Sequence, residues 1–476
     1  MALGIFSVSL WQPWLERDPK QVALNHAGQT LTWQALDSQV AHYAKALREQ
    51  GVRSGEVVTL VGKNHLHTVL WFLACTQVGA LCAFVAPQPL ARLQEKLATL
   101  YAEQSPKRLW LAPSCALSEE EIAELNAHRL SLPDERDESV GGEKVSSQFS
   151  CEQLATLIFT SGSTGTPKAV THTHQQHLAS ARGLLNKFAF TESDSWLLSL
   201  PLYHISGVAI LYRWLAVGAT LKIGTGDLQN DIAGVTHASL VPTQLKRLLD
   251  GRSRLTLKRV LLGGSHIPVE LAQMAATRGI DTWLGYGMTE AASTVTAKRV
   301  DGLAGNGELL DHRELRLVDG RIFIAGKTLA QGYYRQGQLV PLTNEQGWFD
   351  SKDLGRWQGN NLLIDGRADN LFISGGENVH CEEIEAVLNQ HPHVQVAIVI
   401  PVQDSEFGAR PVAVIRSEAE WCQAIGDTWC QGKLEKFKWP IMYFLLPDAL
   451  LDEGIKVSRA AVKAWLAANQ TQFTPL

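Results

Sequence analysis

The sequence is short of charge and has no basic excess. Charged residues make up 19% of its 476 residues, the formal net charge is −5 and the sequence pI is about 6.3. Proteins that bind nucleic acid or an anionic membrane surface usually carry a marked excess of Lys and Arg. The composition therefore favours neither partner, and with 45% apolar residues the chain is expected to be globular.

Cysteine pairs and long apolar runs are also missing. The seven cysteines are scattered, odd in number and never spaced as C-x-x-C, which favours a reducing compartment and buried thiols. The N-terminus lacks a basic region and a small-residue cleavage site. Polar residues, among them His204 and Arg213, interrupt the most apolar stretch, residues 196–223. We therefore expect a cytoplasmic protein without membrane insertion.

Three common motifs of nucleotide-binding proteins and hydrolases are absent. A P-loop needs four residues between its glycines and then Gly-Lys-Ser/Thr, whereas only two residues lie between Gly162 and Gly165 and Lys168 follows a proline. A Gln stands at the third glycine position of a dinucleotide fingerprint that begins at Gly224. No Ser lies in a G-x-S-x-G elbow. Ordinary P-loop kinases, dinucleotide enzymes and α/β-hydrolases are thus disfavoured.

Apolar periodicity predicts two successive strand–helix alternations. A helical stripe covers 32–50, with Thr32 as N-cap and Gly51 as stop. Alternating strands and helices are typical of largely parallel, doubly wound sheets. The expected strands are 57–61, 80–85, 108–112 and 155–159 in the first alternation and 196–200, 219–223, 237–241, 259–262 and 281–284 in the second, with helices at 65–77 and 90–101.

The last third of the chain has a different pattern. Shorter segments with recurrent Gly-rich turns over 314–364 predict an antiparallel β unit, and residues 366–369 are a charged hinge candidate. We expect an α/β protein with a large N-terminal domain, 1–366, of two doubly wound α/β sheets plus a small β-barrel-like unit. A small mobile α+β domain, 367–476, would follow.

The stretch 160–170, TSGSTGTPKAV, has the composition of an anion-binding loop. Its two glycines allow consecutive backbone N–H groups to turn toward one anion, its hydroxyls add donors and Lys168 adds positive charge. A Gly/Ser surface loop is the alternative that composition alone leaves open. The residues that would hold the phosphates are Thr160, Ser161, Gly162, Ser163, Thr164, Gly165 and Lys168.

Further motifs follow this loop in a fixed order. Gly285-Tyr286-Gly287-Met288-Thr289-Glu290 comes after a predicted strand, where open α/β sheets bind ligands. The later motifs are Gly347-Trp348-Phe349-Asp350, Asp353-Leu354-Gly355, Asp365-Gly366-Arg367-Ala368-Asp369, Ser374-Gly375-Gly376-Glu377-Asn378 and Gly454-Ile455-Lys456-Val457-Ser458-Arg459. Each is weak by itself, and their order makes them specific.

Together these motifs resemble the adenylate-forming superfamily of acyl-CoA synthetases, luciferases and peptide-synthetase adenylation domains. The resemblance spans residues 31–466 and implies ATP, Mg²⁺ and CoA as ligands. It implies that Thr289 contacts the α-phosphate, that Glu290 holds Mg²⁺, and that Lys456 bridges the acyl carboxylate and the α-phosphate. It further assigns Tyr286, between Gly285 and Gly287, to adenine stacking, Asp353 and Arg367 to the ribose, Asp369 to the hinge, Gly375 and Gly376 to the CoA tunnel, and Gly263, Gly264 and Ser265 to the pocket.

Three of these assignments have structural alternatives, and one motif departs from the family pattern. Lys456 could be a surface lysine, Asp353 could cap a turn, and Glu290 could be an ordinary carboxylate at a helix start. The usual Gly before the catalytic lysine is Ile455 here. This departure makes the backbone of that loop less certain than the identity of the lysine.

The segment PLYHISG, 201–207, followed by Tyr212-Arg213-Trp214-Leu215, indicates the acid. An Arg in an apolar helix is costly to bury unless it meets an anion; a snorkelling Arg at a helix edge is the alternative. The segment resembles the o-succinylbenzoate:CoA ligases of menaquinone synthesis. That resemblance implies a dicarboxylate, with Arg213 holding the aromatic carboxylate and His204 and Ser206 lining the pocket.

Other readings remain open at this stage. Another aryl or acyl acid:CoA ligase, a stand-alone adenylation domain that serves a carrier protein, and a nucleotide-binding regulator with a degenerate site share these motifs; free CoA is favoured as the acceptor. A homo-oligomer is compatible with the sequence. His172, His174 and His177 suggest metal ligands, but on one helix residues two apart lie about 200° from each other, so we expect no metal site there.

Overall fold

The computed structural model describes residues 8–133, 149–160, 167–251, 255–263, 267, 269–374, 377–404, 406–450 and 457–469. The chain divides into two compact units. The first comprises 1–162, 166–314 and 324–349, and the second comprises 163–165, 315–323 and 350–476. Among the described residues, no helix combines the length and apolar character that crossing a membrane requires.

The first unit contains an eight-stranded sheet whose parallel centre continues into an antiparallel edge. Its strands β3, β4, β5 and β7 pair in parallel, and β8, β18 and β19 extend the sheet in antiparallel fashion. The order along the sheet is β19 (Gln338–Val340), β18 (Gly332–Arg335), β8 (Lys168–Thr173), β7 (Leu154–Thr160), β4 (Leu81–Val85), β3 (Val57–Val61), β5 (Arg108–Leu111) and β6 (His128–Arg129).

A nine-stranded sheet forms the other half of the first unit. Six of its strands pair in parallel, namely β1, β10, β9, β11, β12 and β13. At the edges, β2 pairs antiparallel with β1, and β14 and β15 extend the other side in antiparallel fashion. Its order is β15 (Glu308–Leu309), β14 (Ser293–Arg299), β13 (Asp281–Met288), β12 (Arg259–Leu262), β11 (His237–Leu240), β9 (Ser195–Leu197), β10 (Thr220–Ile223), β1 (Val22–His26) and β2 (Gln29–Thr32).

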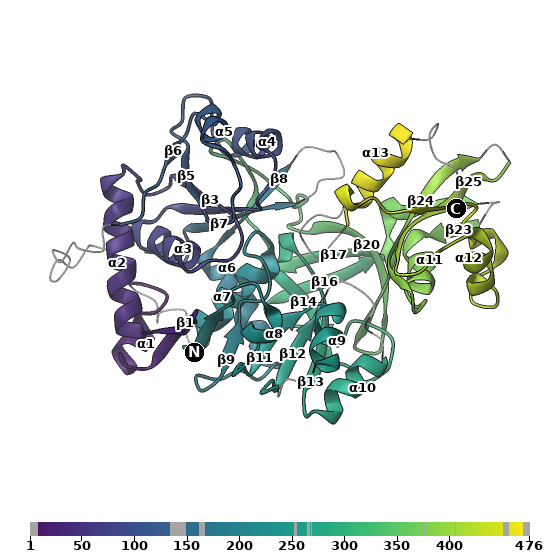
Figure 1. The fold of residues 1–476 in the computed structure, drawn as a ribbon, viewed down its shortest axis with the longest axis horizontal. Coiled ribbons are helices and arrows are strands. Elements are labelled where there is room, and N and C mark those ends of the chain that lie inside the picture. The colour runs from purple at the N-terminus through teal and green to yellow at the C-terminus, as the bar shows by residue number, and fades with distance from the viewer. Residues whose placement is uncertain are drawn as a thin grey trace. The chain divides into compact units, whose positions relative to one another are not determined.

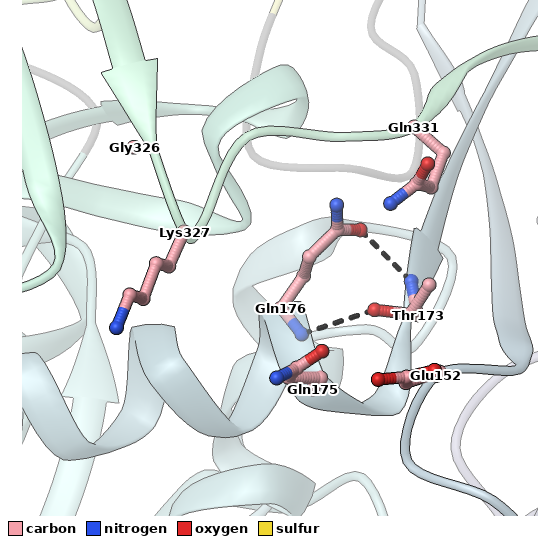
Figure 2. A pocket seen from close by; sticks show the side chains of 7 residues that line it. All are labelled: Glu152, Thr173, Gln175, Gln176, Gly326, Lys327 and Gln331. Carbon is pink, nitrogen blue, oxygen red and sulfur yellow. Dashed lines mark hydrogen bonds between the residues drawn. The ribbon is translucent and has the colours of Figure 1, made fainter.

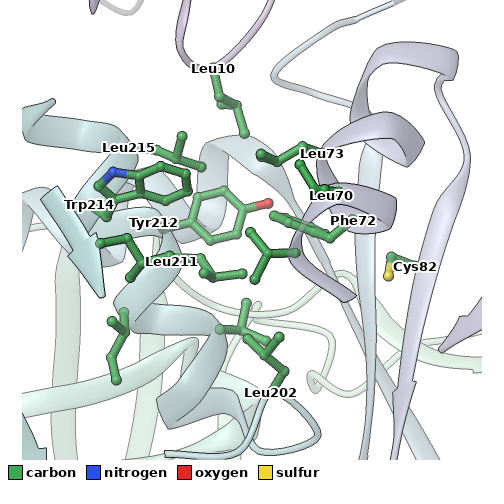
Figure 3. Packing of buried hydrophobic residues seen from close by; sticks show 14 of the residues in the cluster. Leu10, Leu70, Phe72, Leu73, Cys82, Leu202, Leu211, Tyr212, Trp214 and Leu215 are labelled. Atoms are coloured by element: carbon green, nitrogen blue, oxygen red, sulfur yellow. The ribbon is translucent and has the colours of Figure 1, made fainter. Parts of the chain in front are cut away.

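Helices α3 (Leu66–Val78), α6 (His174–Leu185) and α7 (Ile205–Val217) lie between these two sheets in Figure 1. α3 and α7 are apolar on nearly all sides, as helices buried on both faces must be. Figure 3 shows Tyr212 of α7 among leucines of α3 and α7, in the largest apolar cluster of the chain. The other helices are α1 (Gln12–Arg17), α2 (Trp33–Glu49), α4 (Leu90–Leu100), α5 (Glu119–Glu124), α8 (Leu228–Asp231), α9 (Pro242–Asp250) and α10 (Val269–Thr277).

The second unit holds the small α+β part of the chain. A sheet ordered β23 (Glu377–His380), β22 (Leu371–Ser374), β25 (Gly408–Ser417) and β24 (Val394–Asp404), with β26 (Tyr443–Leu445) beside β25, packs with α11 (Cys381–Leu388), α12 (Gln423–Cys430) and α13 (Arg459–Asn469). A four-stranded sheet orders β16 (Arg313–Val318), β17 (Arg321–Gly326), β20 (Phe349–Gln358) and β21 (Asn361–Arg367). The predicted α/β class, with two doubly wound sheets and a small α+β part, is confirmed.

Most predicted boundaries agree with the structure to within two residues. Thr32 caps α2 by accepting a hydrogen bond from the Ala35 N–H, and Gly51 follows with φ +80°. One difference bears on the site. The predicted strand at 281–284 continues to Met288, so Gly285, Tyr286 and Gly287 lie within β13 rather than after it.

Candidate nucleotide and acid site

The ends of the proposed phosphate loop are held together by a hairpin. Thr160, the last residue of β7, lies opposite Lys168, the first residue of β8, in the antiparallel ladder. The connection therefore leaves and re-enters the sheet at one place, as an anion-binding loop requires. Ser161, Gly162, Ser163, Thr164 and Gly165 lie outside the described residues, so their assignment stays a prediction.

Lys168, Tyr333 and Glu290 meet beside this hairpin. The Lys168 Nζ lies 5.3 Å from the centre of the Tyr333 ring, within the range of a cation–π contact. The Tyr333 hydroxyl donates a hydrogen bond of 3.2 Å to Glu290 Oε1. The pKa of Tyr333 is raised mainly by burial and secondly by the Glu290 carboxylate, so the phenol stays protonated and can donate. The lysine of the loop is thus joined through one side chain to the carboxylate proposed for Mg²⁺.

Close packing of β13 against β14 explains the two glycines of the Gly-Tyr-Gly segment. A Cβ on Gly287 would stand 1.9 Å from the carbonyl oxygen of Ser293, and one on Gly285 would stand 2.7 Å from Thr294 Cγ2. Only glycine permits such an approach. The glycines therefore have a structural role that holds irrespective of any ligand, and Tyr286 stands between them on the strand.

Thr289 and Glu290 lie on a one-turn 3₁₀ helix, η3 (Thr289–Ala291), directly after β13. The chain leaves this turn through Ala292 and Ser293, whose φ angles are +52° and +94°. Non-glycine residues seldom adopt positive φ, and such backbone strain concentrates at functional sites. The turn places both side chains, half-buried, at the carboxyl end of β13.

In the second unit, Arg367 links the two aspartates predicted for ribose binding and for the hinge. Asp353 on β20 pairs in register with Arg367 on β21, and Arg367 Nη1 donates to Asp353 Oδ1 at 3.2 Å. Arg367 also donates two hydrogen bonds to Asp369, at 2.8 and 3.0 Å. These bonds lower the pKa of Asp369 and raise that of Arg367. Asp369 is therefore held as a carboxylate.

Arg213 is buried, and no carboxylate among the described residues forms an ion pair with it. It is 2% exposed on α7, its guanidinium lies 5.2 Å from the Trp196 ring centre, and its Nη1 makes a hydrogen bond of 3.5 Å to Ser239 Oγ. It forms no ion pair with any residue in the described ranges. The pKa of Arg213 is lowered to about 9, mainly by burial and secondly by the charge of Arg313. The alternative of a snorkelling Arg at a helix edge is wrong, because the side chain is fully enclosed.

The remaining predicted residues divide into placed and unplaced ones. His204 is the N-cap residue of α7, and Ser206, half-buried, lies in the first turn of that helix, seven residues before Arg213. Gly263 follows β12 and is exposed. Outside the described residues lie Gly264, Ser265, Gly375, Gly376 and Lys456, and their roles stay predictions.

Comparison with known proteins places this geometry in a family. The family model of AMP-binding enzymes matches residues 11–334, which include the hairpin, Arg213, the Thr289–Glu290 turn and Tyr333. The chain belongs to the AMP-binding enzyme family. This AMP-binding enzyme is 42% identical over 464 residues to a 2-succinylbenzoate–CoA ligase of Salmonella typhimurium, covering 96% of this chain and 98% of that protein.

Solved structures of similar proteins carry adenylate ligands. An Escherichia coli MenE variant with bound OSB-AMS is 39% identical, with a TM-score of 0.84 over 97% of this chain and 99% of that one. MenE from Bacillus subtilis in complex with the acyl-adenylate intermediate OSB-AMP is 27% identical, with a TM-score of 0.81 over 92% and 94% of the chains. The latter protein in complex with ATP and a magnesium ion is 26% identical, with a TM-score of 0.79 over 92% and 95%.

The histidines of this AMP-binding enzyme correct one prediction. His172 lies on β8, not on a helix, so its ring reaches that of His177 with 4.9 Å between centroids. The premise that all three histidines lie on one helix is therefore wrong. Two of them contact Tyr212: His177 stacks on that ring and bonds Thr156, and His174 bonds the Tyr212 hydroxyl at 2.8 Å. Burial lowers the pKa values of His172 and His174 to about 3, so both rings are neutral.

A cavity of about 410 Å³ opens beside α6, as Figure 2 shows. It is lined by Glu152, Thr173, Gln175, Gln176, Gly326, Lys327 and Gln331. Thr173 ends β8 and Lys168 begins it, so at about 3.3 Å per residue the cavity lies roughly 17 Å from the loop lysine. Within it, Thr173 and Gln176 form a capping box that starts α6. We assign the cavity no part in the nucleotide site.

Sequence reasoning missed two residues of this AMP-binding enzyme. Tyr333 stands in GYYR, residues 332–335, and only the pairing of β18 with β8 brings it to Lys168 and Glu290. The sequence pattern places Trp196 in a strand, without the stacking role beside Arg213 that the structure reveals. Neither position carries a signal in the local sequence pattern, since both contacts join residues far apart in the chain.

Proposed function

We propose that this AMP-binding enzyme is a 2-succinylbenzoate–CoA ligase of menaquinone biosynthesis. It joins the succinyl carboxylate of o-succinylbenzoate to AMP, releasing pyrophosphate, and then transfers the acyl group to CoA, releasing AMP. The near-full-length similarity to ligases of that name carries the proposal. The buried Arg213, which has no ion pair within the described part of the chain, supports a second carboxylate on the acid.

The first step needs positive charge around the α-phosphate. A carboxylate oxygen of the acid attacks the α-phosphorus, and the bond to pyrophosphate breaks. Negative charge on the phosphoryl oxygens is stabilised by fixed donors and cations. In our proposal the backbone and hydroxyls of the loop, Lys168 and Thr289 hold the phosphates, and Lys456 bridges the two reacting groups.

The residues present fit a magnesium ion. Mg²⁺ prefers oxygen ligands and is usually held by one or two carboxylates together with substrate phosphates. Glu290 supplies such a carboxylate beside the loop, and it is oriented by Tyr333. The described residues contain no group of three His, Cys, Asp or Glu side chains suited to a metal, so nucleotide oxygens would complete the ligand set. Bound there, the ion would offset charge on the phosphates.

The residues that we propose for the ribose and for the hinge lie in the second unit. We propose that Asp353 accepts hydrogen bonds from the ribose hydroxyls, with Arg367 fixing its orientation. We propose further that residues 367–476 act as a lid that rotates about Asp369 between the two steps. Arg367 and Asp369 stand two residues apart at that boundary, and the two hydrogen bonds between them support a pivot there. Lys456 would leave the site after adenylation, and CoA would enter past Gly375 and Gly376.

In the second step the sulfur of CoA attacks the acyl carbonyl carbon, the bond to AMP breaks and the thiol proton is lost. Tyr286 would stack on the adenine, with Gly263, Gly264, Ser265, His204 and Ser206 lining the acyl side. We also propose a cytoplasmic location and small-molecule partners without nucleic acid, with a homo-oligomer as one compatible state. All seven cysteines are free, which supports a reducing compartment.

The experiment that tests this function combines the enzyme with ATP, Mg²⁺, o-succinylbenzoate and CoA. AMP, pyrophosphate and a CoA thioester should appear in equal amounts. Adenylate formation without transfer to CoA would refute the ligase assignment and favour a carrier-linked adenylation domain. Pyrophosphate exchange over a panel of mono- and dicarboxylic aromatic acids tests the acid, and equal exchange with all of them would refute the dicarboxylate.

A further inference from the structure

Two side chains from separate parts of the chain, Lys168 and Glu290, contact Tyr333. Lys168 begins β8, Glu290 lies on η3, and Tyr333 stands on β18, opposite Val170 of β8 in the ladder. The backbone pairing fixes the distance of the tyrosine from the hairpin. Its hydroxyl reaches Glu290 Oε1 at 3.2 Å, while its ring face is 5.3 Å from Lys168 Nζ.

We propose that Tyr333 is a positioning residue of the nucleotide site, which orients the Glu290 carboxylate for the divalent cation and holds Lys168 against its ring. The proposal rests on the proposed function, because it takes Glu290 as the cation ligand and Lys168 as a phosphate contact. The tyrosine itself touches neither ligand in this assignment. It acts through the two side chains that do.

The physical reason lies in the two different contacts of one side chain. A carboxylate on a short turn can rotate about its side-chain torsions, and a hydrogen bond from a fixed donor selects one orientation. The Tyr333 hydroxyl, held on β18, donates to Glu290 Oε1 at 3.2 Å and is such a fixed donor. The ring face attracts the ammonium group of Lys168, which would otherwise sample many rotamers. One residue thus couples the loop to the cation site.

Two substitutions separate the contacts, and a third serves as the control. Tyr333→Phe removes the hydroxyl and keeps the ring, whereas Tyr333→Leu removes both contacts. Tyr334→Phe makes the same chemical change on the neighbouring residue of β18, which is 9% exposed and packs in an apolar cluster away from Glu290. Thermal unfolding of each variant without ligand establishes that it is folded.

The readout is equilibrium ATP binding without the acid, so that no turnover occurs. We titrate MgCl₂ at fixed ATP and compare the result with ATP binding in EDTA. Tyr333→Phe should weaken Mg²⁺-dependent binding by about 10- to 100-fold, the usual effect of removing a partner of a metal ligand, and leave binding in EDTA unchanged. Tyr333→Leu should weaken both, and Tyr334→Phe neither.

A Mg²⁺ titration of Tyr333→Phe that matches the wild type would overturn the proposal, as would an equal loss in Tyr334→Phe. Unaltered ATP binding by Tyr333→Leu in EDTA would overturn the part of the proposal in which the Tyr333 ring holds Lys168. Pyrophosphate exchange by the wild-type enzyme tests the proposed function separately. If exchange requires a different acid, the ligase assignment fails while the binding titrations still decide the role of Tyr333.

Discussion

Replacing Arg213 should improve the resting stability of the enzyme while it destroys recognition of the dicarboxylate. The guanidinium is 2% exposed and has no ion pair among the described residues. Burial holds its pKa at about 9 instead of 12.5. At about 1.4 kcal/mol per pKa unit, the charged form is destabilised in the fold by roughly 5 kcal/mol. The contact with Trp196 returns about 2 kcal/mol at most.

We therefore expect Arg213→Leu to unfold at a temperature equal to or above that of the wild type at pH 7, without substrate. Binding should change in the opposite direction. Loss of a buried partner for the aromatic carboxylate should cost roughly 2–5 kcal/mol, which corresponds to about 30-fold or more in apparent affinity for o-succinylbenzoate. The matched control is 3-benzoylpropionate, which lacks the ring carboxylate and should bind wild type and variant alike.

The pH dependence of unfolding independently checks whether the Arg213 charge destabilises the folded chain. The unfolded chain keeps the Arg213 proton up to about pH 12.5, whereas the folded chain releases it near pH 9. Because stability rises with pH wherever the unfolded state binds more protons, the wild type should gain stability above about pH 9. The advantage of Arg213→Leu should thus shrink between pH 8 and 10.5. A variant that is strongly destabilised at pH 7 and binds both acids like the wild type would refute the reasoning.

Two further predictions concern the other proposed residues. Lys456→Ala should slow adenylation by on the order of 100-fold or more while sparing ATP binding, because it removes a positive charge that stabilises the developing phosphoryl charge. Single-turnover pyrophosphate release measures this rate, with Lys463→Ala on α13 as the control. Near-normal adenylation by Lys456→Ala would remove the assigned role. Asp353→Asn should raise the KM for ATP by about 10- to 100-fold with little change in kcat, the effect of losing a charged hydrogen bond. Asp350→Asn on the same strand, whose carboxylate pairs with Arg321, should leave the KM unchanged, and equal effects of the two substitutions would contradict ribose binding by Asp353.

The local chemistry of the sequence was enough for the elements and for the chemical class. Helix α2, with Thr32 at its start and Gly51 after its end, follows from an apolar stripe and its capping residues. Strand β3 is bounded as its four apolar residues around Thr59 indicate. The order of short motifs from Thr160 to Lys456 implied an adenylating enzyme, which the family match confirms for residues 11–334.

The histidines and the Gly-Tyr-Gly segment show where local reasoning failed. It treated His172, His174 and His177 as one helix, although a strand ends at Thr173 and α6 begins at His174. It also took residues 285–287 as a loop beyond a strand. Glycine usually weakens a strand, but here the neighbouring strand β14 approaches so closely that only glycine fits. Both errors arose because tertiary packing overrode the local signal.

By itself, the sequence determined the α/β class, the motif order and the residue types that suit phosphate, cation and carboxylate. Only the tertiary structure decided that Arg213 is enclosed without a counter-ion among the residues described, and that Tyr333 joins Lys168 to Glu290. The reason is physical. Capping, periodicity and glycine conformation act over a few residues. Burial and strand pairing instead depend on partners far away in the chain, as Lys168 and Tyr333 are, 165 positions apart.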